Sequence, residues 1–189
     1  MKVFIKNMVC NRCISAVEDI FNKAGVGISS VILGEVETEA EVSVESMQRV
    51  EKELLETGFE RIMDSAHQLV EKIKNLVITK ISELDIAEDF LLSEFLSSKL
   101  HKEYSALSKT FSQNENITLE QFFILQKIEK VKELLLYNEF TLTEIAGKLG
   151  YKSVQHLSTQ FRNSTGFTPT EFKKLKEHNR KSLDNLYYF

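Results

Sequence analysis

The sequence predicts an α+β module over residues 1–64, followed by an all-helical domain over residues 65–189. In the first part, short segments that alternate apolar and polar residues are interleaved with segments of helical periodicity, which indicates strands and helices together. From residue 66 on, only the helical spacing recurs. One proline and seven glycines leave little room for a disordered linker between the two parts.

The composition of the 189-residue chain, with 42% hydrophobic and 28% charged residues, is typical of a soluble globular protein. No apolar run approaches the roughly 20 residues that span a bilayer, and the N-terminus lacks a signal-peptide core, so we expect a cytoplasmic protein. The net charge is −4, but it is unevenly distributed. Residues 1–64 carry 7 Lys and Arg against 12 Asp and Glu, whereas residues 141–189 carry 8 against 4. A basic C-terminal part is compatible with DNA binding.

The first module is predicted to follow the order βαββαβ, which is that of a ferredoxin-like sandwich. Its predicted strands cover residues 2–8, 29–33, 36–42 and 59–63. One helix covers residues 11–24, and a second begins at the capping residue Ser43 and ends at Gly58. Four glutamates are expected on one face of the third strand, namely Glu35, Glu37, Glu39 and Glu41. We interpret that row as a solvated face, and contact with the basic domain is the alternative.

The only two cysteines, Cys10 and Cys13, follow the first strand directly and form the pattern M-x-C-x-x-C with Met8. Cys13 would lie in the first turn of a helix, where the helix dipole favours a thiolate, and Arg12 adds a positive charge beside it. Two thiolates suit Cu(I) or another soft metal ion far better than magnesium or calcium.

On this motif, the module resembles the heavy-metal-associated domain of copper chaperones and metal-transport ATPases. The resemblance implies that Cys10 and Cys13 bind one soft ion such as Cu(I), while Met8 packs beneath the loop. The sequence departs from the family at Asn7, where Gly is usual, and at Val9, where Thr or His is common. A thioredoxin-like redox pair would need aromatic and proline neighbours that are missing. Metal or thiol sensing and a module that retains only the fold stay open.

Residues 141–164 have the pattern of a helix-turn-helix. Thr141 and Glu144 form a capping box that begins the first helix, and Gly150 ends it because glycine adopts the left-handed conformation without steric cost. Ser153 caps the second helix. The inner face of that helix consists of Val154, Leu157 and Phe161. Its outer face is polar and consists of Gln155, Ser158, Thr159 and Arg162. Amide and hydroxyl groups can read base edges, although an outer face of this kind is commonly just solvated.

This stretch resembles the second helix-turn-helix of the AraC/XylS family of bacterial transcription regulators. The similarity lies in E-I-A-x-x-x-G-Y-x-S at 144–153, F-[KR] at 161–162 and G-x-T-P-x-x-F at 166–172. Leu157 stands where the family usually has Phe. The resemblance covers residues 66–182 and implies sequence-specific binding to promoter or operator DNA, with RNA polymerase as a further partner. The DNA contacts it implies are Ser153, Gln155, Ser158, Thr159 and Arg162.

A weaker copy of the same unit precedes it over residues 92–113. His101 takes the place of the turn glycine, which is tolerable because His is enriched at positive φ. The turn of this copy is predicted to be one residue shorter, and Ser112 stands where the second copy has Arg162. Its predicted outward, DNA-facing residues are Ser105, Ser108 and Lys109. Two units in one chain are what the AraC/XylS family has.

Two long helices are predicted around the first unit. One covers residues 66–83 and could couple the two domains. The other begins at the capping box of Thr118 and Gln121 and runs to about Tyr137, so it is about 30 Å long, close to the roughly 34 Å of one DNA turn. Near the C-terminus, the Lys and Arg residues of 173–181 could contact phosphates or be merely solvated, and the tail at 186–189 has no assigned role.

We expect a transcription regulator that responds to a soft metal ion or a thiol state. The alternative is a metal-trafficking or sensor protein whose helical half is a protein-docking domain. An enzyme is not expected, because the sequence has no triad and no phosphate-binding glycine loop, and its four histidines are scattered.

Overall fold

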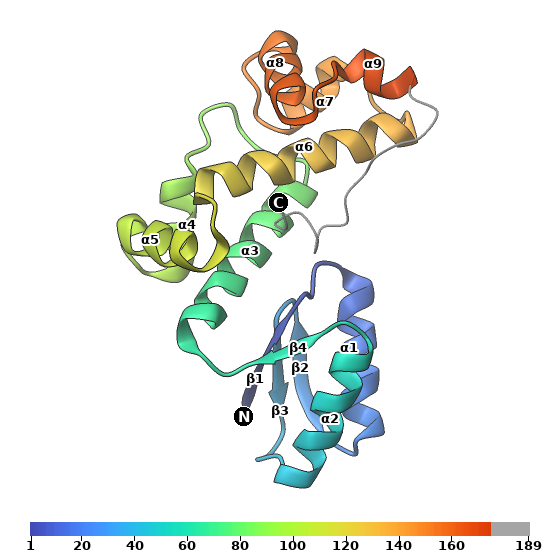
Figure 1. The fold of residues 1–189 in the computed structure, drawn as a ribbon, viewed down its shortest axis with the longest axis vertical. Coiled ribbons are helices and arrows are strands. Elements are labelled where there is room, and N and C mark those ends of the chain that lie inside the picture. Colours follow the sequence, from blue (N-terminus) through green and yellow to red (C-terminus); the bar gives the residue numbers. More distant parts are fainter. Residues whose placement is uncertain (175–189) are drawn as a thin grey trace. The chain divides into compact units, whose positions relative to one another are not determined.

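The computed structural model describes residues 1–174, and it divides into two compact units, Met1–Asn75 and a second unit that begins at Leu76. The first contains a small antiparallel sheet with helices, and the second is helical (Figure 1). The division falls within helix α3 (Ser65–Ser82), so the first unit extends beyond the predicted end at residue 64. The predicted basic residues at 176–181 and the tail at 186–189 lie outside the described part of the chain.

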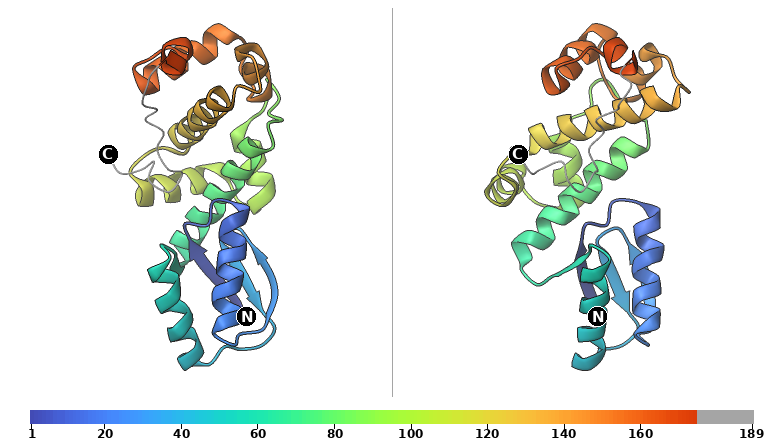
Figure 2. Two further views of the ribbon diagram at one scale, coloured as in Figure 1. Left: turned by 90° about the vertical axis from the view of Figure 1, so that its right-hand side faces the viewer. Right: turned by 45° about the vertical axis from the view of Figure 1, so that its right-hand side comes forward.

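In the first unit, α1 and α2 lie side by side on one face of a four-stranded sheet (Figures 1 and 2). The elements follow one another as β1 (Lys2–Lys6), α1 (Asn11–Lys23), β2 (Ile28–Ile32), β3 (Glu35–Thr38), α2 (Val44–Glu56) and β4 (Glu60–Ile62). The strand order is β2-β3-β1-β4, and all neighbours are antiparallel. Alternate residues of β1, Val3 and Ile5, enter the core beneath the helices, where they join Val36, Phe21 and Leu54.

The first half of α3 packs against the opposite face of the same sheet. Phe4 and Glu35 are partners in the β1–β3 ladder and point away from the core. Lys72 of α3 lies over the Phe4 ring, with Nζ 4.7 Å from its centroid, and 3.6 Å from the Glu35 carboxylate. The first half of α3 therefore contacts this second face of the sheet through Lys72.

The expected row of four glutamates on one strand is wrong, because β3 ends at Thr38. The Thr38 amide donates to Met1 O (2.8 Å), and its hydroxyl donates to Ala40 O (2.7 Å), so the chain turns where β1 begins and no neighbouring strand continues. Glu39 and Glu41 therefore lie beyond the strand. Glu35 is not solvated either, since its side chain is only 12% exposed and pairs with Lys2.

The second unit is arranged around the long helix α6. Besides the end of α3, its elements are α4 (Leu92–Leu100), α5 (Tyr104–Glu115), α6 (Leu119–Tyr137), α7 (Leu142–Lys148), α8 (Val154–Thr165) and α9 (Pro169–Lys174). Figure 1 shows α6 running between the α4–α5 pair and the group of α7, α8 and α9, and α6 contacts α5, α7, α8 and α9. The predicted capping box of Thr118 and Gln121 is confirmed, and 19 residues give α6 a length of about 28 Å.

Helix α6 is buried on more than the one apolar face that the sequence predicts. Phe122, Ile128, Val131 and Leu135 are buried as expected. Four polar side chains are buried with them, namely Gln126, Lys127, Glu129 and Lys132. The reason is that helices pack against α6 from several sides, so positions off the apolar stripe are covered as well. Among the described residues, no helix combines the length and the apolar character needed to cross a membrane.

Replacing Gly150 by Ala is expected to destabilise the protein more than replacing Gly166. Both glycines have positive φ, +68° and +82°, so both variants incur the backbone cost of about 1–2 kcal/mol. At Gly150 the new Cβ would also lie 2.7 Å from the backbone oxygen of Ala87, whereas nothing lies within 4 Å at Gly166. We expect an additional loss of about 1–3 kcal/mol at Gly150. Urea denaturation of both variants measures the difference, and equal losses would contradict the close approach.

Candidate nucleic-acid interface and cysteine pair

The second helix-turn-helix, α7 and α8, begins and turns where the sequence predicts. The Glu144 amide donates to Thr141 Oγ1 (3.3 Å), and the Thr141 amide donates to Glu144 Oε2 (2.7 Å), which completes the capping box. The hydrogen bonds that the Thr141 amide and hydroxyl donate to the Glu144 carboxylate lower the pKa of Glu144, so this carboxylate stays charged at the helix start. Gly150 adopts φ +68°, and Ser153 Oγ caps α8 by accepting from the His156 amide (3.1 Å).

The residues predicted to read DNA lie on the outer side of α8. Leu157 and Phe161 are fully buried against the rest of the unit. Exposed on the other side are Ser153, Gln155, Thr159 and Arg162, and Ser158 is half-buried at the edge of this face. His156 and Asn163 are also exposed on α8 and were missed by the sequence pattern, although each directly follows a predicted residue. The outer face of α8 is therefore polar and accessible along its length.

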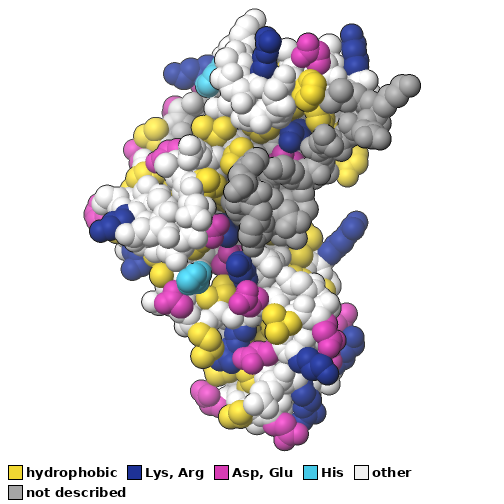
Figure 3. All heavy atoms as spheres, in the orientation of Figure 1, with side chains coloured by type: hydrophobic (Ala, Val, Ile, Leu, Met, Phe, Trp, Pro, Cys, Tyr) yellow, Lys and Arg dark blue, Asp and Glu magenta, His cyan; other side chains and the backbone are white. Residues whose placement is uncertain are grey.

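The surroundings of α8 carry positive charge. Residues 141–174 contain five Lys and Arg against two Glu. Figure 3 shows Lys and Arg side chains on the surface over α7, α8 and α9, at the top of the view. Lys173 donates to Asn138 Oδ1 (2.5 Å), whereas Lys152, just before α8, and Arg162, on α8, are exposed. Phosphate groups would meet a favourable field at this surface.

The first helix-turn-helix, α4 and α5, has the same construction as the second, but with weaker caps and a poorer turn. His101 adopts φ +52° in the turn, as predicted. Helix α5 begins three residues after His101, whereas α8 begins four residues after Gly150, so the predicted shorter turn is confirmed. Ser105 and Lys109 are exposed on α5, and Ser108 is half-buried. Neither α4 nor α5 has a side-chain cap at its N-terminus.

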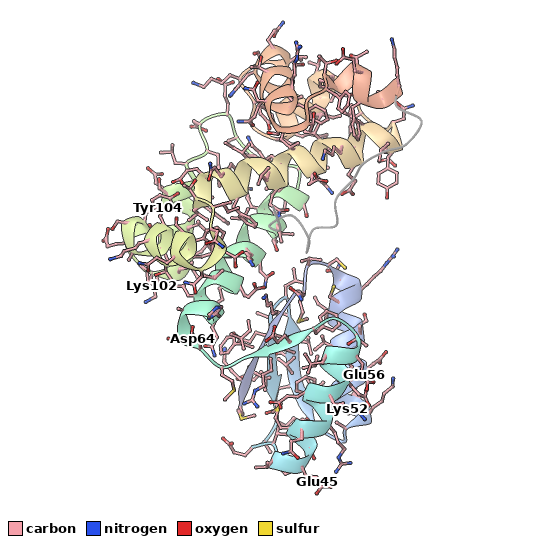
Figure 4. The ribbon with its side chains drawn as sticks, in the orientation of Figure 1. Glu45, Lys52, Glu56, Asp64, Lys102 and Tyr104 are labelled. Carbon is pink, nitrogen blue, oxygen red and sulfur yellow. The ribbon has the colours of Figure 1, made fainter. Side chains whose placement is uncertain are left out.

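Tyr104, at the start of α5 (Figure 4), is a contact that sequence reasoning missed. Its hydroxyl donates to Glu120 Oε1 of α6 at 2.5 Å. Partial burial and this carboxylate raise the pKa of Tyr104 well above its ordinary value, so the phenol stays protonated and keeps donating. The hydrogen bond joins the N-terminus of α5 to the first turn of α6.

The turn between α7 and α8 receives two contacts from outside the helix-turn-helix. The Ile86 amide donates to Lys148 O (3.0 Å), and Ile86 and Leu149 form a parallel bridge. Lys127 Nζ of α6 donates to Leu149 O (3.2 Å) and lies 3.9 Å from the centroid of the Tyr151 ring. Burial lowers the pKa of Lys127 to about 8. Sequence reasoning missed this contact, because it joins Lys127 to a residue 22 positions later and no local pattern indicates it.

The two cysteines lie together at the start of α1. Cys10 is the exposed N-cap residue, Cys13 is half-buried in the first turn, and their Sγ atoms are 3.4 Å apart. Met8 is fully buried, as the resemblance implies. Asn7, at the position where Gly is usual, adopts φ +72°, and its Nδ2 donates to Gly58 O (2.9 Å). Asn is one of the residues that tolerate this conformation, so the loop keeps its turn without the glycine.

The two thiols have opposite electrostatic surroundings. At Cys10, burial is the largest single influence and opposes ionisation, but hydrogen bonds from Cys13 and from the Arg12 backbone, together with the Arg12 charge, outweigh it and lower the pKa. At Cys13, burial dominates and raises the pKa. Within the described residues, no cluster of three or more Cys, His, Asp or Glu side chains surrounds the pair. Two adjacent free thiols fit a soft ion that needs few protein ligands.

Comparison with known proteins places the similarity in the helical unit. A family model described as a helix-turn-helix domain matches residues 96–175. An uncharacterized HTH-type transcriptional regulator of Staphylococcus aureus is 33% identical over 91 residues, which is 48% of this chain and only 12% of the relative's length. Residues 96–175 are thus similar to a helix-turn-helix domain, in agreement with the AraC-type DNA-binding domain expected from the sequence.

Two solved structures are among those similar to this chain. The C-terminal domain of the two-component response regulator yesN from Fusobacterium nucleatum is 31% identical, with a TM-score of 0.47, and the match covers 55% of this chain and 99% of that one. The C-terminal domain of AraT, a response regulator from Geobacillus stearothermophilus, is 23% identical, with a TM-score of 0.48, and covers 59% and 93%.

The buried Lys127 is expected to give the protein a pH-dependent stability. Its pKa is about 8 in the folded protein against 10.5 as the ordinary value, so between these pH values the unfolded chain binds more protons at this site. The free energy of unfolding of the parent, relative to Lys127→Met, should therefore rise with pH across this window, by about 1 kcal/mol per pH unit. Urea denaturation from pH 7.5 to 10.5 tests it, with Lys130→Met on the same helix as control. A difference that stays flat would contradict the effect of burial.

Proposed function

We propose that the protein is a DNA-binding transcription regulator of AraC type. The observation that carries this proposal is the outer face of α8, which is exposed and polar in the second of two helix-turn-helix units. The match of residues 96–175 to a helix-turn-helix family supports it. So does the name of the Staphylococcus aureus relative, an HTH-type transcriptional regulator, over the segment the two proteins share.

In this proposal α8 enters the major groove of promoter or operator DNA and reads bases. The amide of Gln155 and the hydroxyl of Thr159 suit base edges, whereas the guanidinium of Arg162 suits a phosphate. Helix α5 would enter a second groove with Ser105 and Lys109 outward. Helix α6 contacts both helix-turn-helices and is about 28 Å long. The two reading helices, α5 and α8, would therefore lie about one turn of DNA apart.

For the first structural unit, Met1–Asn75, we propose a ferredoxin-like, heavy-metal-associated module. In this module Cys10 and Cys13 sense a soft metal ion or a thiol state. The element order and the antiparallel strand order β2-β3-β1-β4 support the fold. The adjacent thiols, the buried Met8 and the turn at Asn7 support the site. Both thiolates would hold an ion such as Cu(I), and the two thiol protons would be released when the ion binds. The alternative function, metal trafficking with a docking domain, predicts no affinity for DNA.

Variants on the outer face of α8 are expected to separate base reading from phosphate contact. Thr159→Ala or Gln155→Ala should cost about 1–3 kcal/mol on a specific duplex and should relax sequence preference. Arg162→Ala should weaken specific and random duplexes alike and reduce the salt slope by about one. Fluorescence anisotropy at several salt concentrations measures both effects, with Thr79→Ala, an exposed residue of α3, as control. If all variants bind like the parent, α8 is not the reading face.

Loss of either thiol is expected to abolish binding of a soft ion. The reduced parent should bind one Cu(I) per chain in competition with a chromophoric chelator, and Cys10→Ser and Cys13→Ser should not. Ser43→Ala, which removes the cap of α2 but no thiol, serves as control, and circular dichroism checks that each variant is folded. Unchanged Cu(I) affinity in the double serine variant would leave the module with a structural role alone.

A further inference from the structure

Lys127 is a buried cation, and the need to fill space in the core does not explain why a charged residue stands at this position. It is 8% exposed, and within residues 1–174 no carboxylate lies within ion-pair distance of it. Removing a charge from water costs several kcal/mol unless other interactions replace its hydration, whereas a Leu or Met would fill the same space without that cost. The interactions of its Nζ must therefore offset the desolvation.

Two of the interactions of this Nζ are directed at the turn that precedes α8, and a third is with the Phe123 ring on α6 itself, 5.1 Å from its centroid. Lys127 Nζ donates to Leu149 O (3.2 Å), at the negative end of the α7 dipole, where a cation is favoured. It also lies over the face of the Tyr151 ring, 3.9 Å from the centroid. The Tyr151 hydroxyl in turn donates to Gln160 Oε1 on α8 (2.7 Å). A chain of contacts thus leads from α6 through the turn to the residue that follows Thr159.

The segment before α4 holds the same turn through its backbone. The Ile86 amide donates to Lys148 O (3.0 Å), and Ala87 O lies where a Cβ on Gly150 would be. The carbonyl groups of Lys148 and Leu149, at the end of α7, thus accept hydrogen bonds from the Ile86 amide and the Lys127 ammonium group. Neither donor belongs to α7 or α8. The start of α8 is therefore held relative to α6 and to Ile86 and Ala87.

We infer that Lys127 is a positioning residue for DNA recognition. It acts with Ile86 and Ala87 to set the orientation in which α8 presents Gln155 and Thr159. This inference rests on the proposed function. Lys127 itself does not contact DNA, because it is buried beneath the turn. Its loss misplaces base-reading side chains while the exposed phosphate-binding side chains, on flexible stems, still find the backbone.

The test compares Lys127→Met, which keeps the length of the side chain, with Lys127→Arg and with Lys130→Met on the same helix. Affinities for a specific and a random duplex are measured by anisotropy at several salt concentrations, well below the unfolding temperature. Lys127→Met should lose about tenfold on the specific duplex, with the random duplex and the salt slope unchanged. Lys127→Arg should recover most of this loss, and Lys130→Met should stay within about twofold of the parent. Equal losses on both duplexes with a lower salt slope would show a phosphate contact and overturn the inference, as would no loss.

Two further measurements keep the inference separable from folding and from the proposed function. If Lys127→Met does not fold, Tyr151→Phe removes only the hydroxyl bonded to Gln160 and should show the same selective loss on the specific duplex. Amide hydrogen exchange needs no DNA. Exchange at Ile86 should accelerate in Lys127→Met relative to Val131 of the α6 core. If the parent binds no duplex, the proposed function fails, and unchanged exchange at Ile86 would overturn the positioning role independently.

Discussion

The carbonyl groups at the end of a helix need partners that the helix itself cannot supply. At the end of α7, the amides of Gly150 and Tyr151 in the turn supply some of these partners, and residues outside the helix-turn-helix supply the others. Helix α7 has only seven residues, and Gly150 turns the chain immediately after it. The amide of Ile86 donates to the carbonyl of Lys148, and the ammonium group of Lys127 donates to the carbonyl of Leu149. Since α8 begins a few residues later, the direction of its polar face depends on these two hydrogen bonds.

The two helix-turn-helices differ in how their helix starts are capped and in the residue that forms the turn. The second has side-chain caps on both helices and glycine in the turn. The first lacks side-chain caps and places His101 at positive φ, and its α5 is joined to α6 by the Tyr104–Glu120 hydrogen bond. In the first structural unit, the cysteine loop depends in a similar way on Asn7, which adopts the left-handed conformation and bonds to Gly58.

Features that depend on residues within four positions of each other were predictable from the sequence. The capping boxes at Thr118 and Thr141 and the outer face of α8 are of this kind, because helical spacing and cap chemistry are local. The end of β3 at Thr38 was not predictable, because it depends on where β1, far away in sequence, begins. The burial of Lys127 likewise depends on a turn 22 residues later, which no local pattern encodes.

The central claim is that the outer face of α8 meets DNA. It is tested most directly by titrating the isotope-labelled protein with a duplex selected from a random-sequence pool and following the backbone amide resonances. The account predicts that the largest changes fall on α8, at Gln155, Thr159 and Arg162, with smaller changes on α5 at Ser105 and Lys109, while amides of the sheet such as Val36 do not move. Resonance changes confined to the first structural unit, Met1–Asn75, with α8 unaffected, would contradict the claim.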